Sequence, residues 1–288
     1  MAKVFTLTCN LLAQHSLDFA AVKPGAVNRA KRGEFCVGGK GVNVAAALLK
    51  MGVGACAVIF SGGKTGERCE EFLAKKGVEF LAVKTECETR SGFVCRAENC
   101  ETSFFEPDAF LSDGDFENAC SLIERRAEEG DILAFCGSAP NWSAGKFAAL
   151  KSLLKIKNLR FVCDTYGAPL KDLFFEKSEI LKINSGEFFA FSNKNLAEGF
   201  CEFQRETPAK FFGVTGGANS AFARIGNSVK KFEPSKIEGV AYATGCGDAV
   251  LASLIKSLEK NGECSFEDFE LAMDFATKQA KNPSIYGL

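Results

Sequence analysis

The chain has 288 residues, of which 47% are hydrophobic, and its 35 basic and 36 acidic residues give a net charge of −1. This length and apolar fraction suit one large α/β domain or two small ones, and the balanced charge without a basic tract argues against nucleic acid and anionic membrane as partners. No apolar run approaches the length of a membrane span, and the short, polar N-terminal segment does not resemble a signal peptide.

The cysteine pattern narrows the options further. Thirteen cysteines are scattered along the chain without a Cys-x-x-Cys pair, and His15 is the single histidine. A Cys/His zinc site would therefore have few ligands, and buried free thiols in a reducing compartment are the expected state. We expect a cytoplasmic protein.

In chain order, strand-like and helix-like segments alternate along most of the sequence. Strands are expected at 3–9, 56–60, 132–136, 160–164, 180–184 and 211–215, followed by a hairpin of 220–225 and 228–232. Helices are expected at 41–51, 67–75, 116–129, 142–155, 248–260 and 266–281. This alternation predicts an α/β fold with a mostly parallel central sheet and helices on both faces.

Two segments do not follow this alternation. Residues 84–89 and 92–97 have the pattern of two strands with no helix between them. Together with the polar segment 10–35 they predict a small sheet that stands off the main domain.

The most informative stretch is Ala-Thr-Gly-Cys-Gly-Asp-Ala at residues 243–249. A Gly-x-Gly turn that leads into an apolar helix can bind an anion through its backbone N–H groups and the helix dipole. A carboxylate at this point, Asp248, would repel a bound anion, but it can take a proton from a hydroxyl that attacks a phosphorus. Alone, the segment is equally consistent with an ordinary strand–turn–helix junction.

A second glycine-rich turn enters a helix at residues 38–43, where Lys40 and Asn43 accompany the glycines. Gly63-Lys64-Thr65 matches part of a P-loop, but the earlier glycine that the motif requires would fall at Val58. We therefore reject a P-loop and expect a loop before the helix at 67–75.

Two more strands end in polar or small residues. Asn184 and Glu187 follow the strand 180–184 and suit a hydrated magnesium ion, although a helix cap explains them equally well. Thr215 and Gly217 follow the strand 211–215. Such positions at the carboxyl edge of an open sheet favour a nucleotide site. Arg90 either pairs with a strand neighbour or clamps a phosphate bidentately.

These motifs, in this order, resemble the PfkB/ribokinase family of sugar kinases over nearly the whole chain. The resemblance rests on residues 38–43, 137–140, 182–187 and 244–248. Residues 24–30 and 88–90 resemble the 1-phosphofructokinase and tagatose-6-phosphate kinase branch, whose substrates already carry a phosphate. The resemblance implies a ribokinase-like three-layer α/β/α fold, with one PfkB-type kinase domain over 1–288 and a small β-sheet lid from about 10–35 and 84–106.

The resemblance also implies a role for each motif residue. Asp248 would be the catalytic base, and the anion hole for the transferred phosphoryl group would consist of Gly245, Cys246 and Gly247. The substrate side would comprise Gln14, Gly38, Gly39, Lys40, Asn43 and Ser138, with Arg90 on the substrate's existing phosphate. ATP and Mg²⁺ would be served by Lys182, Asn184 and Glu187, with Glu187 reaching the metal through water, and by Thr215 and Gly217 beside the nucleotide.

The implied function is ATP-dependent phosphorylation of a sugar hydroxyl, with fructose 1-phosphate, fructose 6-phosphate or tagatose 6-phosphate as the expected kind of acceptor. The lid makes a homodimer in many family members, and a potassium requirement is left open.

The sugar side departs from the family pattern. Gln14 stands where the family has an Asp, and residues 102–108 read Thr-Ser-Phe-Phe-Glu-Pro-Asp in place of Thr-Glu-x-Asn-x-Pro-Gly, so Phe105 replaces a polar lid residue. Tyr242 and Ala243 also replace a polar pair before the anion hole. A kinase of an unphosphorylated sugar or nucleoside, and a degenerate kinase that senses nucleotide or sugar phosphate, are therefore the alternatives.

Overall fold

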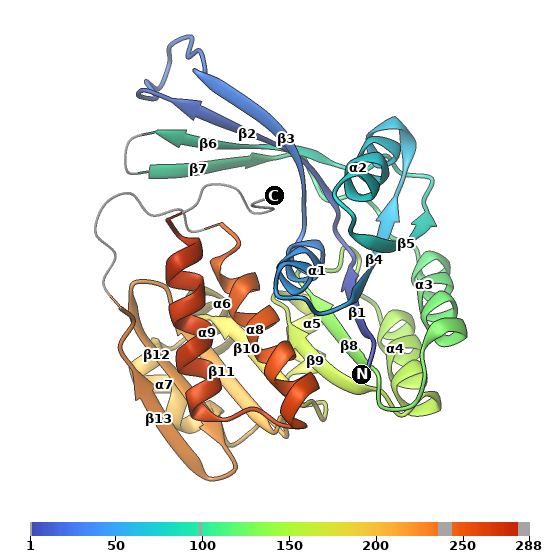
Figure 1. The fold of residues 1–288 in the computed structure, drawn as a ribbon, viewed down its shortest axis with the longest axis vertical. Coiled ribbons are helices and arrows are strands. Elements are labelled where there is room, and N and C mark those ends of the chain that lie inside the picture. Colours follow the sequence, from blue (N-terminus) through green and yellow to red (C-terminus); the bar gives the residue numbers. More distant parts are fainter. Residues whose placement is uncertain (1, 98–99, 236–243, 282–288) are drawn as a thin grey trace.

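The computed structural model describes residues 2–97, 100–235 and 244–281 (Figure 1). Within them, nine strands form one large sheet in the order β13-β12-β11-β10-β9-β8-β1-β4-β5. Their bounds are β1 Val4–Thr8, β4 Ala55–Ser61, β5 Glu79–Lys84, β8 Ile132–Cys136, β9 Arg160–Asp164, β10 Ile180–Asn184, β11 Phe211–Gly216, β12 Asn219–Ile225 and β13 Ser228–Phe232. The pairs from β5 to β11 are parallel, and β12 and β13 add an antiparallel edge.

Helices cover both faces of this sheet. One face carries α1 Lys40–Lys50, α2 Gly63–Lys75, α8 Cys246–Asn261 and α9 Phe266–Gln279. The other carries α3 Asp113–Arg126, α4 Ala144–Ile156, α5 Ala168–Leu173, α6 Ser185–Ser192 and α7 Leu196–Phe203. The predicted three-layer α/β/α arrangement is confirmed.

Phenylalanine forms much of the core on both faces, because successive residues of a strand point to opposite sides of a sheet. In β11, the ring of Phe211 lies 5.4 Å from that of Phe269 in α9, while the ring of Phe212 lies 5.2 Å from that of Phe200 in α7. The high phenylalanine content thus serves packing in both layers.

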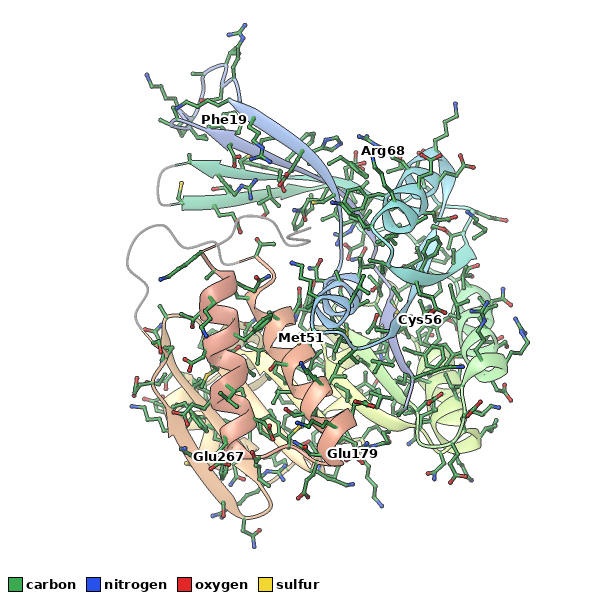
Figure 2. The ribbon with its side chains drawn as sticks, in the orientation of Figure 1. Phe19, Met51, Cys56, Arg68, Glu179 and Glu267 are labelled. Atoms are coloured by element: carbon green, nitrogen blue, oxygen red, sulfur yellow. The ribbon has the colours of Figure 1, made fainter. Side chains whose placement is uncertain are left out.

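A second sheet has the order β3-β2-β6-β7, with β2 Leu12–Phe19, β3 Arg32–Gly38, β6 Ser91–Ala97 and β7 Cys100–Phe105. It stands off the main domain (Figure 1), and Phe19 in it lies at the opposite end of the molecule from Glu179 and Glu267 (Figure 2). We call this sheet the lid sheet. Its link to the main domain includes a hydrogen bond that Thr244 Oγ1 donates to Glu101 Oε1 in β7.

The prediction of a strand at 84–89 is wrong. The chain leaves the main sheet where β5 ends at Lys84, and 85–90 is a connection whose turn is closed by the Thr85 hydroxyl bonding to the Cys87 carbonyl (2.9 Å). The strand that pairs antiparallel with β6 is β7. The segment 84–89 contains a single apolar residue, Cys87, so it lacks the alternation of a half-buried strand, and the apolar run before it forms β5.

The start predicted for the second helix is also wrong, since α2 begins at Gly63 rather than at residue 67. Gly62 is the N-cap, and a side chain there would collide with the Cys87 carbonyl. The Gly-Lys-Thr triplet is therefore the first turn of a helix. No helix in the described part of the chain is both long and apolar enough to cross a bilayer.

Candidate active site

The N-termini of α1 and α8 meet where the parallel strands end. Gly245, the N-cap of α8, has a φ of 84°, which disfavours any residue with a side chain, and it sets the turn that exposes the first N–H groups of the helix. Asp248 lies in the first turn of α8 and is only 6% exposed. Buried carboxylates are rare without a functional or pairing reason.

Asp248 is held by α1. Asn43 Nδ2 donates a hydrogen bond of 2.7 Å to Asp248 Oδ2. Burial raises the pKa of Asp248 to about 6, an effect that Lys40 and the Asn43 hydrogen bond oppose and Asp164 reinforces. A carboxylate with this pKa is ionised at neutral pH and is a stronger base than an exposed one.

Two lysines share one buried carboxylate beside this turn. Lys40 Nζ lies 2.6 Å from Asp164 Oδ1 and 2.6 Å from Glu187 Oε1, and Lys182 Nζ lies 2.9 Å from Asp164 Oδ2. Burial favours neutral Asp164, but the two lysines outweigh it and lower its pKa. Burial opposes the charge on Lys40, yet the carboxylates around it raise its pKa. Asp164 and Lys40 therefore stay charged at neutral pH.

Lys182 lies directly against the glycine-rich turn. A Cβ added to Gly247 would lie 2.8 Å from Lys182 Nζ. Lys182 is 1% exposed and belongs to β10 of the main sheet. The turn thus combines the backbone N–H groups at a helix N-terminus with an ammonium group, which together suit a phosphoryl group.

Cys246, between the two glycines of this turn, has a raised pKa of about 11, because it is largely buried and lies near Asp248. Its thiol is therefore protonated at neutral pH and adds no charge to the turn. It occupies the position as a small neutral side chain.

Asn184 and Glu187 form a capping box at the start of α6. Asn184 Oδ1 accepts from the Glu187 N–H and Glu187 Oε2 accepts from the Asn184 N–H, both at 2.9 Å. The cap explanation is therefore geometrically right, and it leaves Glu187 Oε1 to reach Lys40. Thr215 pairs with Asn184 in the sheet register, and Gly217 lies exposed in the turn after β11.

The turn before α1 is packed so closely that side chains are excluded. Gly39 has a φ of 121°, and a Cβ there would lie 2.6 Å from Thr8 Cγ2. A Cβ on Gly38 would lie 2.9 Å from Gln14 Oε1, so the buried Gln14 amide contacts the entrance of α1. Gln14 Nε2 donates to Ser16 Oγ at 3.1 Å.

A separate group of polar side chains lies between β1, the lid sheet and the loop after β7. Asn10 Nδ2 donates to Ser138 Oγ (2.9 Å) and to Asp108 Oδ1 (2.8 Å). Arg90 Nη1 donates to the same Asp108 oxygen at 2.8 Å. Arg90 thus has a carboxylate partner in a loop, rather than the strand neighbour expected as its ordinary alternative.

Sequence reasoning missed Asp164 and Asp108 as members of these groups. Asp164 is the last residue of a buried parallel strand whose bounds were predicted correctly, and a carboxylate at that position is a usable signal. Asp108 gave no such signal, because it lies in a loop and contacts Asn10, 98 positions away in the chain.

Comparison with known proteins places this arrangement in context. The chain matches the model of the pfkB family carbohydrate kinases over residues 8–281. It is 26% identical to the 1-phosphofructokinase of Borreliella burgdorferi, covering 96% of this chain and 91% of that protein. It is 27% identical to the ATP-dependent 6-phosphofructokinase isozyme 2 of Escherichia coli K12, covering 91% and 87%.

The fold is also similar to that of a solved structure, phosphofructokinase-2 from Escherichia coli in complex with substrates and products. The TM-score is 0.86 at 23% identity, covering 96% of this chain and 93% of that one. The same Escherichia coli protein has been solved in complex with potassium and in a tetrameric inhibited form.

Proposed function

Because the chain belongs to the PfkB family of carbohydrate kinases, we propose that it transfers a phosphoryl group from ATP to a hydroxyl of a sugar phosphate. The relatives named 1-phosphofructokinase and 6-phosphofructokinase support a phosphorylated sugar as the acceptor. Fructose 1-phosphate, fructose 6-phosphate and tagatose 6-phosphate are the acceptors to test first.

The observation that carries this proposal is the position of buried Asp248 directly after the Gly245–Gly247 turn. In the proposed reaction, Asp248 takes the proton of the acceptor hydroxyl as its oxygen attacks the terminal phosphorus of ATP. Its pKa of about 6 leaves it ionised at pH 7 to 8. Asn43 fixes the carboxylate by bonding to Oδ2, which leaves Oδ1 for the hydroxyl.

Positive charge close to the turn supports the same reaction. Lys182 lies against Gly247, and Lys40 is near enough to Asp248 to oppose the rise in its pKa. As negative charge builds on the transferred phosphoryl oxygens, the ammonium of Lys182 and the N–H groups of the turn would stabilise it. Since Asp164 holds Lys182 in place, this charge is positioned before substrate binds.

A kinase of this family uses ATP together with a divalent cation, and the carboxylates here fit magnesium. The described residues contain no cluster of three or more His, Cys, Asp or Glu side chains that could hold a metal alone. Mg²⁺ typically keeps several waters and takes one or two carboxylates plus phosphate oxygens. Glu187 would reach a hydrated ion through water, and the ion would supply charge neutralisation for the phosphates of ATP.

We also propose that the activity depends on potassium, because phosphofructokinase-2 from Escherichia coli has been solved in complex with potassium. Measuring the rate in potassium salts and in sodium salts tests this dependence directly.

A homodimer through the lid is supported by Phe93 and Phe104, which face each other across β6 and β7 and are 45% and 59% exposed. Adjacent exposed aromatic rings on one face of a sheet are typical of an interface.

The experiment for the proposed function is a screen of sugars and sugar phosphates for acceptor-dependent release of ADP. Turnover of at least one hexose phosphate, well above the rate with the matching free sugar, is the expected result. Turnover only with free sugars or nucleosides would replace the acceptor class, and clear ATP binding without any turnover would replace the enzyme by a sensor.

A further inference from the structure

The side chain of Arg90 is already engaged by a carboxylate. Arg90 Nη1 lies 2.8 Å from Asp108 Oδ1, and Asn10 Nδ2 lies 2.8 Å from the same oxygen. The Arg90 side chain is 13% exposed, whereas that of Asp108 is 53% exposed. One partner of this ion pair is therefore fixed within the protein, and the other is open to solvent.

Arg90 is held from a second side by the lid sheet. Its guanidinium carbon lies 5.5 Å from the centre of the Phe105 ring. Phe105 in turn lies where a side chain on Gly92 would otherwise stand. The arginine is thus supported by β7 as well as by Asp108.

Two buried polar atoms beside this ion pair lack hydrogen-bond partners in the described part of the chain. They are Arg90 Nε and Asn10 Oδ1. Buried polar atoms without partners are costly and usually point to a missing ligand or water. A ligand with both hydrogen-bond donors and acceptors, such as a sugar phosphate, could satisfy both atoms.

The loop that carries Asp108 is anchored on both sides of it. Glu106 exchanges two hydrogen bonds with Ser91, through its backbone N–H (3.0 Å) and through Oε2 (2.7 Å). Downstream, Leu111 N–H donates to Asn141 Oδ1 at 3.5 Å. The exposed carboxylate of Asp108 can therefore turn away from Arg90 without a rearrangement of the loop.

We propose that Asp108 competes with the acceptor for Arg90, occupying the Arg90 phosphate site until the phosphate of the acceptor displaces it. This inference rests on the proposed function, because it takes the acceptor to be a sugar phosphate.

Asp108 then competes with the acceptor for Arg90. A partly exposed ion pair is weak, whereas a phosphate dianion offers more charge and bidentate geometry to a guanidinium, so the phosphate wins. An unphosphorylated sugar brings no anion and leaves the ion pair intact. A singly charged sugar acid offers Arg90 only what Asp108 already provides. Asp108 therefore lowers the affinity for phosphorylated acceptors and leaves the binding of free sugars unchanged.

The test is Asp108→Asn, which keeps the size of the side chain and its acceptor oxygen but removes the charge. The KM for the phosphorylated acceptor should fall about fivefold, equivalent to about 1 kcal/mol, with kcat, the KM for ATP and the KM for any free sugar unchanged. Glu106→Gln is the matched control, because it removes one negative charge from the same loop without a contact to Arg90. It should leave the KM unchanged.

A double-mutant cycle tests whether the effect of Asp108→Asn depends on Arg90. In an Arg90→Ala background, where the KM for the phosphorylated acceptor is already high, Asp108→Asn should have no further effect, because the competition is gone. An effect of the same size in that background would overturn the inference. So would a higher KM in Asp108→Asn, which would mean that Asp108 binds the acceptor directly.

Calorimetric titration with fructose 6-phosphate and with inorganic phosphate distinguishes a failure of the inference about Asp108 from a failure of the proposed function. If sugar phosphates are turned over but Asp108→Asn binds them no more tightly, the inference about Asp108 fails and the proposed function stands. If neither protein binds or turns over any sugar phosphate while a free sugar is phosphorylated, the proposed acceptor class fails, and the inference fails with it.

Discussion

Asn43 and Asp248 lie 205 residues apart in the chain, and a hydrogen bond of 2.7 Å joins Asn43 Nδ2 to Asp248 Oδ2. It joins the first turns of α1 and α8, both of which begin in glycine-rich turns. The proposed base is thus oriented by the motif at the other end of the sequence.

Replacement of the proposed base should slow turnover strongly without unfolding the protein. In Asp248→Asn we expect kcat to fall by about 10²–10⁴-fold, because general base catalysis typically accelerates a reaction by that factor. The Kd for ATP should stay nearly unchanged. Because the pKa of Asp248 is raised, its ionised form lowers folding stability above pH 6. The variant should therefore melt at a higher temperature than wild type at pH 8, by a margin that shrinks toward pH 5. Near-normal kcat would remove Asp248 from the mechanism.

The pH dependence of the rate provides an independent test of the same residue. With a pKa of about 6, Asp248 is protonated and inactive in acid, so kcat/KM should rise through pH 6 and level off above pH 7. The Asn43 hydrogen bond lowers this pKa, so Asn43→Ala should move the acid limb to higher pH. The phosphate of an acceptor also titrates near pH 6, so the diagnostic quantity is the shift between the two proteins. An unshifted limb would argue that another group titrates.

A methyl group at position 247 should damage phosphoryl transfer by displacing a lysine. In Gly247→Ala, the new Cβ would stand 2.8 Å from Lys182 Nζ, which the Asp164 ion pair and burial hold in place. We expect kcat/KM for ATP to fall by about tenfold or more, as for loss of one stabilising donor. Gly54→Ala is the control, because a Cβ at Gly54 meets nothing within 4 Å. Equal kinetics in the two variants would show that Lys182 has room to move.

The proposed lid interface predicts a change of oligomeric state from a single surface substitution. Phe93→Glu places a charge on the exposed face that Phe93 and Phe104 share, so a homodimer should dissociate in sedimentation velocity at micromolar concentration. Phe175→Glu is the control, because Phe175 is similarly exposed (54%) but follows α5, outside the lid sheet. A Phe93→Glu variant that stays dimeric would place the interface elsewhere, and a monomeric wild-type protein would mean that the lid forms no homodimer.

The sequence predicted the central sheet well, because buried parallel strands are short apolar runs with clear ends. The strands 132–136, 160–164 and 180–184 have the predicted bounds. The error at 84–89 arose because the apolar strand β5 ends at Lys84, where the predicted strand began, and the segment after it has one apolar residue, Cys87. Only the tertiary structure distinguishes a strand that pairs with β6 from a segment that crosses between sheets.

The parts of the candidate site that consist of glycine-rich turns could be predicted from the sequence. The parts that depend on contacts between residues far apart in the chain could not. The glycine-rich turns at 38–41 and 245–247 require close packing that other residues cannot satisfy, so the sequence reveals them. The partners of Arg90 and Lys40 depend on which loop and which strand end arrive beside them. Asp108 and Asp164 therefore became visible only in three dimensions.

The hydrogen bond between Thr244 and Glu101 has a consequence for unproductive ATP consumption. Thr244 directly precedes the Gly245–Gly247 turn, and Glu101 belongs to the lid sheet, so a lid that swings away also releases the turn from its tether. Hydrolysis of ATP by water needs the turn in place while no acceptor is present. We therefore expect Glu101→Ala, which removes the tether, to lower both ADP release without acceptor and sugar phosphorylation, whereas unchanged rates would mean that the turn holds its shape without the lid.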